Sequence, residues 1–209
     1  MKCGTKLEKQ LLAEGYRLIA GVDEVGRGAL AGPVVAASVI LNLKDVPKGI
    51  NDSKQLSKAR RERLAEEIKS RAVAFSIARV EPDEIDKINI LRASLQAMGE
   101  SVKLLNPPSD YVLIDGNQRI SQLSCPQRPV VKGDSLCVSI AAASIIAKVA
   151  RDELMRTYEE IYPGYGFAAH VGYGTRLHQQ ALTKLGPSPI HRMTFQGVRF
   201  LQLCLTIEE

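Results

Sequence analysis

Short apolar segments rich in β-branched residues alternate with longer amphipathic segments along most of this chain. Three of the apolar segments, Leu18–Val22, Pro33–Leu43 and Tyr111–Ile114, carry no charge and are typical of buried strands. Two further segments, Ala72–Val80 and Pro129–Lys132, are expected to complete the set of strands. This alternation predicts an α/β fold with a central mixed sheet, and 209 residues are enough to bury a full hydrophobic core.

The segments between and after these strands favour helices. Thr5–Glu14 is amphipathic, Ser57 is a good helix cap, and Pro82 suits the first turn of a helix that continues to Leu105. Val138–Glu160 predicts a long helix whose many alanines allow close packing on the sheet. We expect residues 1–209 to form a single domain, with about 160–209 as a C-terminal helical segment.

The composition limits what the chain can bind. Lys and Arg number 28 against 23 Asp and Glu, a net charge of +5 that is compatible with a polyanionic partner without requiring one. There is no Trp, and the 4 Phe and 6 Tyr are fewer than base stacking on single strands usually needs. The amino-terminal segment is charged, and no apolar run approaches the roughly 20 residues that span a bilayer. We therefore expect a cytoplasmic protein that does not bind membranes.

The cysteines and histidines do not follow a familiar metal-binding pattern. There is no C-x-x-C pair and the spacings fit no zinc site, so we expect reduced thiols, as in a cytosolic protein. We interpret the histidines as structural. The residues concerned are Cys3, Cys125, Cys137, Cys204, His170, His178 and His191.

Acidic residues stand where predicted strands end or a helix begins. Asp23 and Glu24 end the first strand, Asp115 ends another, and Asp134 precedes the long helix. Ligand sites of α/β sheets lie beyond strand ends, and converging carboxylates repel one another unless divalent cations lie between them. Oxygen ligands favour Mg²⁺ or Mn²⁺, and two such ions can promote phosphodiester hydrolysis. Taken singly, each acid is better explained as a cap of a turn or helix, so both interpretations stay open here.

A glycine-rich loop, Gly26 to Gly32, follows the first pair of acids. Its glycines permit close backbone approach to a ligand, and backbone amides and carbonyls can distinguish a ribose 2′-hydroxyl from deoxyribose. The pattern G-x-G-x-x-x-G also weakly resembles a dinucleotide-binding fingerprint, which gives NAD binding as an alternative. A strand rather than a helix is expected to follow the loop, and the two preceding acids would oppose a pyrophosphate, so the alternative is disfavoured.

Several motifs, taken together and in order, resemble bacterial ribonuclease HII, a type 2 ribonuclease H. The resemblance spans roughly residues 15 to 200, which makes it far more specific than any single motif. The junction-reading motifs distinguish it from the type 3 relatives. The matching segments are Gly21–Gly28, Asn51–Leu56, Leu113–Asn117, Val131–Ser135, Ile140–Val149, Arg151–Asp152, Tyr165–Phe167, His170 and Gly172–Tyr173.

The resemblance implies a ribonuclease H-like mixed five-stranded sheet flanked by helices. It implies that Asp23, Glu24, Asp115 and Asp134 are catalytic acids that bind two Mg²⁺ or Mn²⁺ ions. The implied reaction hydrolyses the RNA strand of RNA/DNA hybrids and cuts on the 5′ side of single ribonucleotides in duplex DNA. It leaves 3′-hydroxyl and 5′-phosphate ends, in ribonucleotide removal or primer processing. The alternative is a hybrid-binding module that has lost catalysis, which the four intact acids disfavour.

The same resemblance assigns residues to the substrate. The backbone of Gly26, Arg27 and Gly28 is implied to contact the 2′-hydroxyl. Tyr173 is implied to lie against the sugar of the following deoxynucleotide. Phosphate-holding roles, in decreasing order of support, fall to Asn51 and Lys54, then to Ser144 and Lys148.

Four further observations complete the expectations. Ala29 replaces a proline and Val171 a lysine that the family often carries, and loss of that lysine would remove one phosphate contact. Arg151 and Asp152 are interpreted as an ion pair. Gln202–Leu205 faintly resembles a sliding-clamp-binding peptide, although chance apolar patterning explains it better. We expect a monomer.

Overall fold

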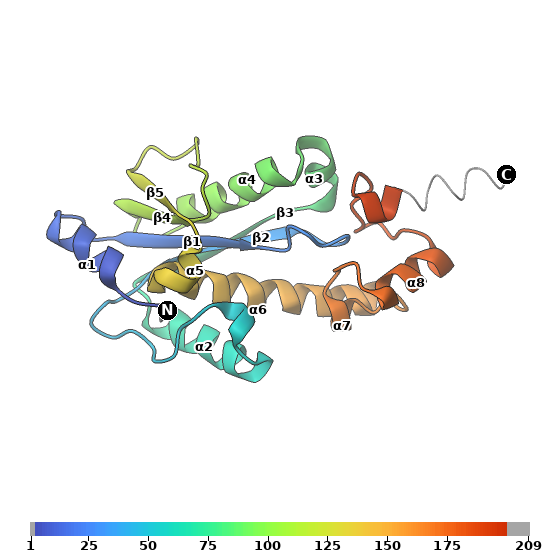
Figure 1. Cartoon of the computed structure of the whole chain (residues 1–209), viewed down its shortest axis with the longest axis horizontal. Helices are drawn as coiled ribbons and strands as arrows, with labels where there is room; N and C mark the ends of the chain where they lie inside the picture. The colour runs from blue at the N-terminus through green and yellow to red at the C-terminus, as the bar shows by residue number, and fades with distance from the viewer. Residues whose placement is uncertain (1–2, 200–209) are drawn as a thin grey trace.

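The computed structural model describes residues 3–199, and a single sheet of five strands lies at its centre (Figure 1). The order across the sheet is β3-β2-β1-β4-β5. The strands are β1 (Ile19–Val25), β2 (Val34–Ile40), β3 (Ala74–Val80), β4 (Tyr111–Asp115) and β5 (Gln127–Val130). The helices are α1 (Lys6–Ala13), α2 (Lys58–Arg71), α3 (Pro82–Ile88), α4 (Ile90–Lys103), α5 (Gly133–Leu136), α6 (Val138–Ile161), α7 (Phe167–His170) and α8 (Arg176–Leu185), with a 3-10 turn at Ser53–Gln55.

The sheet is mixed, as the sequence predicts. β2 pairs antiparallel with both β1 and β3, whereas β4 pairs parallel with both β1 and β5. The predicted α/β fold class is therefore confirmed. Because β1 and β4 are parallel neighbours, their carboxyl ends meet at the same edge of the sheet.

Helices cover both faces of this sheet. α3 and α4 lie on one face, and α2 and α6 lie on the other (Figure 1). Side chains of β2 alternate between the two faces, so Ala36 packs with the α4 side and Ala37 with the α6 side. Burial on both faces explains why the central strands are continuously apolar in sequence.

The helix α6 approaches β1 very closely. A Cβ atom added at Gly21 would lie 2.2 Å from the backbone carbon of Ser139, so only glycine fits there. Ala142 and Ala143 are fully buried in the layer between α6 and the sheet. The predicted long helix is confirmed to within one residue. The close approach fixes the first turn of α6, and with it α5, relative to the strand that carries Asp23.

The segment from Pro82 to Leu105 forms two helices, so the prediction of one continuous helix is wrong. Asn89 separates them with a φ of +70°. Its side-chain oxygen accepts hydrogen bonds from the amides of Leu91 and Arg92 at 3.0 and 3.1 Å, which caps α4. Among residues 3–199, no helix is both long enough and apolar enough to cross a membrane.

Candidate active site

The four acids singled out in the sequence line one pocket of about 530 Å³ at the carboxyl ends of β1 and β4. The glycine loop, the 3-10 turn, α5, α6 and the Tyr173 turn complete its walls. The lining residues are Asp23, Glu24, Val25, Gly26, Arg27, Gly28, Ser53, Lys54, Asp115, Asp134, Ser144, Lys148 and Tyr173.

Sheet register brings the acids together from distant parts of the chain. Val22 pairs with Ile114 across the parallel strands, so the next residues, Asp23 and Asp115, occupy adjacent strand ends. An oxygen of Asp115 accepts a hydrogen bond from the amide of Gly133 at 2.7 Å and one from the amide of Asp134 at 3.3 Å. Asp115 therefore ties the α5 turn, and the acid on it, to the end of β4.

Burial and mutual repulsion raise the pKa values of three of these carboxyl groups. The pKa of Asp23, which is 6% exposed, is raised well above its usual range by burial, then by the charges of Glu24 and Asp115. Burial also raises the pKa of Glu24, against the opposing charge of Arg27. The pKa of Asp115 is raised by burial and by the neighbouring charge of Asp134. The carboxylate charges in this pocket therefore repel one another, and a bound cation would offset that repulsion.

Two basic side chains contact the acids. The Arg27 guanidinium lies 3.1 Å from a carboxylate oxygen of Glu24. The Lys54 ammonium lies 4.0 Å from Asp134, and the Lys54 side chain is 82% exposed, so this contact is weak. The acidic pocket therefore keeps a local excess of carboxylates over basic partners.

The acids suit an open site for a hard divalent cation. All four donors are carboxylates, which Mg²⁺ and Mn²⁺ prefer. Among residues 3–199, no three His, Cys, Asp or Glu side chains are already close enough together to enclose an ion. Mg²⁺ is usually held by one or two carboxylates together with water and substrate phosphate rather than by an all-protein cage. The residues present fit that kind of site.

The glycine loop and the Tyr173 turn lie side by side in the wall of the pocket. Ala29 forms an antiparallel bridge with Tyr173, and the amide of Leu30 donates to the carbonyl of Gly172 at 2.8 Å. Gly26 has a φ of +94°, and an added Cβ there would lie 2.2 Å from the Nε atom of Arg151. The backbone of the loop is therefore held directly beside Tyr173, which is 36% exposed.

Two buried arginines hold this arrangement, and sequence reasoning missed both roles. Arg151, expected to pair with Asp152, instead donates to the carbonyls of Ala31, Pro33 and Val171 at 2.8 to 3.0 Å. Asp152 contacts Lys148 and Arg61. Arg192 donates to the carbonyls of Gly32 and Arg27 at 2.8 to 3.0 Å. Neither role has a local signal, because every partner is a backbone group far away in sequence.

Of the four residues expected to hold phosphates, three line the pocket and one does not. Lys54, Ser144 and Lys148 line the pocket. The Asn51 side chain is beside the 3-10 turn and donates to Gln55 at 3.1 Å. Ser53 also lines the pocket and its hydroxyl is 3.0 Å from that of Ser144.

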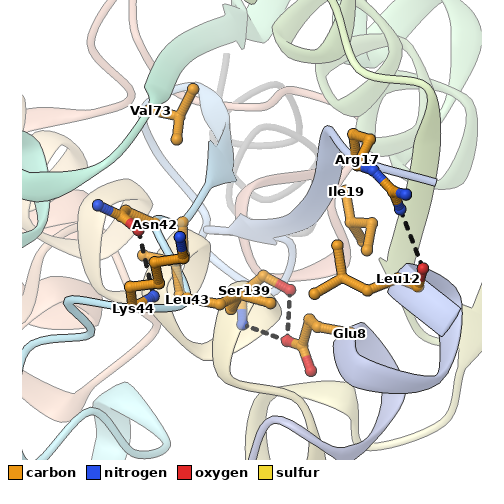
Figure 2. A pocket seen from close by; sticks show the side chains of 10 residues that line it. Glu8, Leu12, Arg17, Ile19, Asn42, Leu43, Lys44, Val73 and Ser139 are labelled. Carbon is orange, nitrogen blue, oxygen red and sulfur yellow. Dashed lines mark hydrogen bonds between the residues drawn. The ribbon is translucent and has the colours of Figure 1, made fainter. Parts of the chain in front are cut away.

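A second, smaller pocket of about 240 Å³ is lined by residues of α1, the starts of β1 and α6, and the segment after β2 (Figure 2). Glu8 lies at its edge, and one of its carboxylate oxygens accepts hydrogen bonds from the amide and the hydroxyl of Ser139 at 2.9 and 2.7 Å. The same oxygen accepts from the Cys137 thiol. Glu8 therefore anchors α1 to the start of α6, and the acids described above do not reach this pocket.

Comparison with known proteins agrees with this architecture. The family described as Ribonuclease HII matches residues 20–198. A ribonuclease HII of Geobacter sulfurreducens is 54% identical over 194 residues, which cover 92% of this chain and 88% of the relative. The ribonuclease H2 of Pyrococcus horikoshii OT3 has a TM-score of 0.77 at 25% identity, covering 91% of this chain and 99% of that one. A ribonuclease HII of Archaeoglobus fulgidus, solved in complex with PCNA, has a TM-score of 0.74 at 26% identity, covering 86% and 96%.

The mixed sheet and these relatives define a ribonuclease H enzyme. The resemblance inferred from the sequence motifs is confirmed. The chain belongs to the ribonuclease HII family.

Proposed function

We propose that this protein is an endonuclease that hydrolyses the RNA strand of RNA/DNA hybrids and cuts on the 5′ side of single ribonucleotides in duplex DNA. The products carry 3′-hydroxyl and 5′-phosphate ends. The reaction uses two divalent ions, Mg²⁺ or Mn²⁺, held by Asp23, Glu24, Asp115 and Asp134.

One observation carries this proposal: the four acids share a single pocket with the glycine loop and Tyr173. Hydrolysis and recognition of the sugar can therefore act on the same nucleotide. The presence of Gly26, Arg27 and Gly28 in this pocket supports backbone contacts with a 2′-hydroxyl, which both donates and accepts hydrogen bonds. Tyr173 lines the same pocket and is 36% exposed, which supports a contact with the next sugar.

The remaining side chains of the pocket have two proposed roles, which are binding of the metal ions and binding of the phosphates. When bound, the ions would activate a water molecule and neutralise charge on the leaving oxygen. The carboxylates of β1, β4 and α5 would hold the ions beside the glycine loop. Lys54 and Lys148 line the pocket from two different elements, which supports a role in holding phosphates of the bound strand. The Lys148 ammonium also pairs with Asp152 at 2.7 Å.

The test is a labelled DNA duplex with one ribonucleotide, incubated with the full-length protein and Mg²⁺ or Mn²⁺. We expect a single cut on the 5′ side of the ribonucleotide, absent with EDTA and absent in an all-DNA duplex. Cleavage of long hybrids alone would keep the nuclease and reject the junction roles of the glycine loop and Tyr173. Hybrid binding without cleavage in either metal would favour a binding module that has lost catalysis.

Protein partners stay at the level of prediction. The Archaeoglobus fulgidus relative was solved with PCNA. We propose that clamp binding by this chain be tested at Gln202–Leu205. That segment lies outside the described residues. The expectation of a monomer is equally a proposal.

A further inference from the structure

A chain of hydrogen bonds runs through two buried histidines to the backbone of Tyr173. The amide of Ser188 donates to Nδ1 of His191 at 2.8 Å; the Ser188 hydroxyl lies 2.8 Å and the Ser188 carbonyl oxygen 3.3 Å from the same nitrogen. Nε2 of His191 lies 3.0 Å from Nε2 of His178, and Nδ1 of His178 lies 3.0 Å from the carbonyl oxygen of Tyr173. His178 is 0% exposed and His191 is 2% exposed, so water does not interrupt the chain.

The chemistry of its two ends fixes the direction of this chain. An amide only donates, and its contact with Nδ1 of His191, at 2.8 Å, is shorter than that of the Ser188 carbonyl oxygen, at 3.3 Å, so Nδ1 accepts and the proton is on Nε2. A carbonyl only accepts, so Nδ1 of His178 carries the proton and Nε2 of His178 accepts from His191. Both rings are therefore neutral, in opposite tautomers. Burial favours this state, because it lowers the pKa of each ring to about 4.

This series of hydrogen bonds from Ser188 through His191 and His178, called the relay below, ends on Tyr173. The backbone of Tyr173 has further hydrogen bonds at both its amide and its carbonyl. The amide of Tyr173 donates to the carbonyl of His170 at 3.0 Å, and the carbonyl of Tyr173 also accepts from the amide of Thr175 at 2.8 Å. His178 adds the second donor to that carbonyl. The His170 ring stacks on His178 with centroids 4.3 Å apart, which restricts the position of the His178 ring.

Apolar side chains alone would fill this volume at a lower desolvation cost than two imidazoles. The relay differs from apolar packing in one respect, because it ends on the carbonyl of a residue in the acidic pocket. We propose that His178 and His191 are positioning residues that hold Tyr173 against the glycine loop for recognition of the RNA-to-DNA junction. The inference rests on the proposed function, in which Tyr173 contacts the sugar after the ribonucleotide.

The relay itself is tested without substrate. In full-length protein with ¹⁵N-labelled histidine, NMR of the ring nitrogens reports the tautomer of each residue at pH 7. We expect the Nδ1–H form for His178 and the Nε2–H form for His191. An Nε2–H form or a doubly protonated ring at His178 would overturn the relay. This measurement uses the unaltered protein, so it does not depend on whether a variant folds.

Its action on Tyr173 is tested by comparing cleavage of a single-ribonucleotide duplex with cleavage of a continuous hybrid. His178→Phe keeps a ring but removes both hydrogen bonds. We expect the ratio of the two rates to fall about tenfold, since a misplacement of ~1 Å can cost about 100-fold in rate. His178→Asn places an amide donor where Nδ1 was and should restore most of the ratio.

Two comparisons separate positioning from loss of stability. Leu182 lies one turn after His178 on α8, in a buried apolar cluster that includes Phe167, whose ring packs against His178. Leu182→Ala should lower the melting temperature while leaving the ratio unchanged. In a Tyr173→Ala background, His178→Phe should have no further effect on the ratio. An equal loss of ratio in Leu182→Ala, or an additive loss in the double variant, would overturn the positioning role.

Failure of the proposed function has a different signature. If the unaltered protein did not cut at a single ribonucleotide, the junction role of Tyr173 would be rejected before any histidine variant was compared. The tautomers would still report whether the relay exists. A correct junction cut with an unchanged ratio in His178→Phe would reject the positioning role alone.

Discussion

The guanidinium of Arg27 lies 3.1 Å from the carboxylate of Glu24, so the glycine loop supplies a cation to the acid at the end of β1. The Arg27 side chain is 50% exposed and the Glu24 side chain 9% exposed, which allows the arginine to leave while the carboxylate stays. This contact opposes the effect of burial on the pKa of Glu24. It also places Arg27 in competition with any divalent ion that Glu24 binds.

Arg27→Gln should therefore strengthen metal binding by the free protein. At pH 8, we expect the dissociation constant for Mn²⁺ to fall about two- to fivefold, as an exposed ion pair contributes about 0.5–1 kcal/mol. Calorimetric titration measures this directly. Arg79→Gln is the matched control, because Arg79 pairs with Glu81 away from the pocket and its loss changes the net charge equally. Unchanged or weaker binding in Arg27→Gln alone would contradict the competition.

Asp23→Asn should abolish cleavage and stabilise the metal-free fold at pH 8. Cleavage is expected to fall by about 1000-fold or more, as with the loss of an essential catalytic group. The pKa of Asp23 is raised in the folded state, so the folded state holds the proton more tightly and its stability falls as pH rises through that range. A neutral Asn removes this loss. Urea unfolding at pH 8 and product sizing measure the two effects.

The exposed acid Asp83 provides the control for Asp23, because it lies on α3 outside the pocket. Asp83→Asn should leave both cleavage and stability close to those of the unaltered protein. A near-normal rate in Asp23→Asn would show that the assignment of the catalytic acids is wrong.

Much of the fold could be predicted because apolar runs and helix caps are visible within a few residues of sequence. β1, β2 and β4 contain uncharged apolar runs, and β3 alternates between buried and exposed residues. The helix after Ser57 begins with a side-chain cap, in which the Ser57 hydroxyl accepts from the amide of Arg60. The helix break at Asn89 was missed because an asparagine inside a helical pattern does not show that it caps the helix that follows. The four acids could be chosen because each ends a strand or begins a helix.

The contacts that hold the glycine loop and Tyr173 in place could not be predicted, because they join residues far apart in the sequence. Arg192 reaches the carbonyl of Arg27 across 165 residues. The sequence predicts only a structural role for His178 and His191, and their spacing does not show that their rings meet 3.0 Å apart. The motifs predicted residues that line the acidic pocket, whereas the buried arginines and histidines behind them became visible only with the fold.

The buried histidine pair should make the fold less stable in mild acid. The pKa of each ring is lowered to about 4, against about 6.5 in the unfolded chain. Between these values the unfolded state binds more protons, so stability falls as pH falls from about 6.5 and levels off below about 4. The expected loss is about 3 kcal/mol for each histidine.

Urea unfolding of the unaltered protein and His178→Asn at pH 7, 5.5 and 4.5 isolates this effect. The raised pKa values of Asp23 and Asp115 act in the opposite direction in both proteins, so they cancel in the comparison. The unaltered protein should lose more stability than the variant over this range. Parallel curves would show that His178 does not remain neutral in the fold.

Val171→Lys should tighten substrate binding and make it more sensitive to salt. Val171 occupies the left-handed region, with φ +46° and ψ +38°, where a β-branched side chain is strained. It directly precedes Gly172 and Tyr173 at the pocket. A lysine there would add one phosphate contact, so the slope of log K against log salt should steepen by about 0.9. Val171→Asn is the control, because it relieves strain of about 1 kcal/mol without adding charge. An equal slope in the Lys and Asn variants would place residue 171 outside the path of the bound strand.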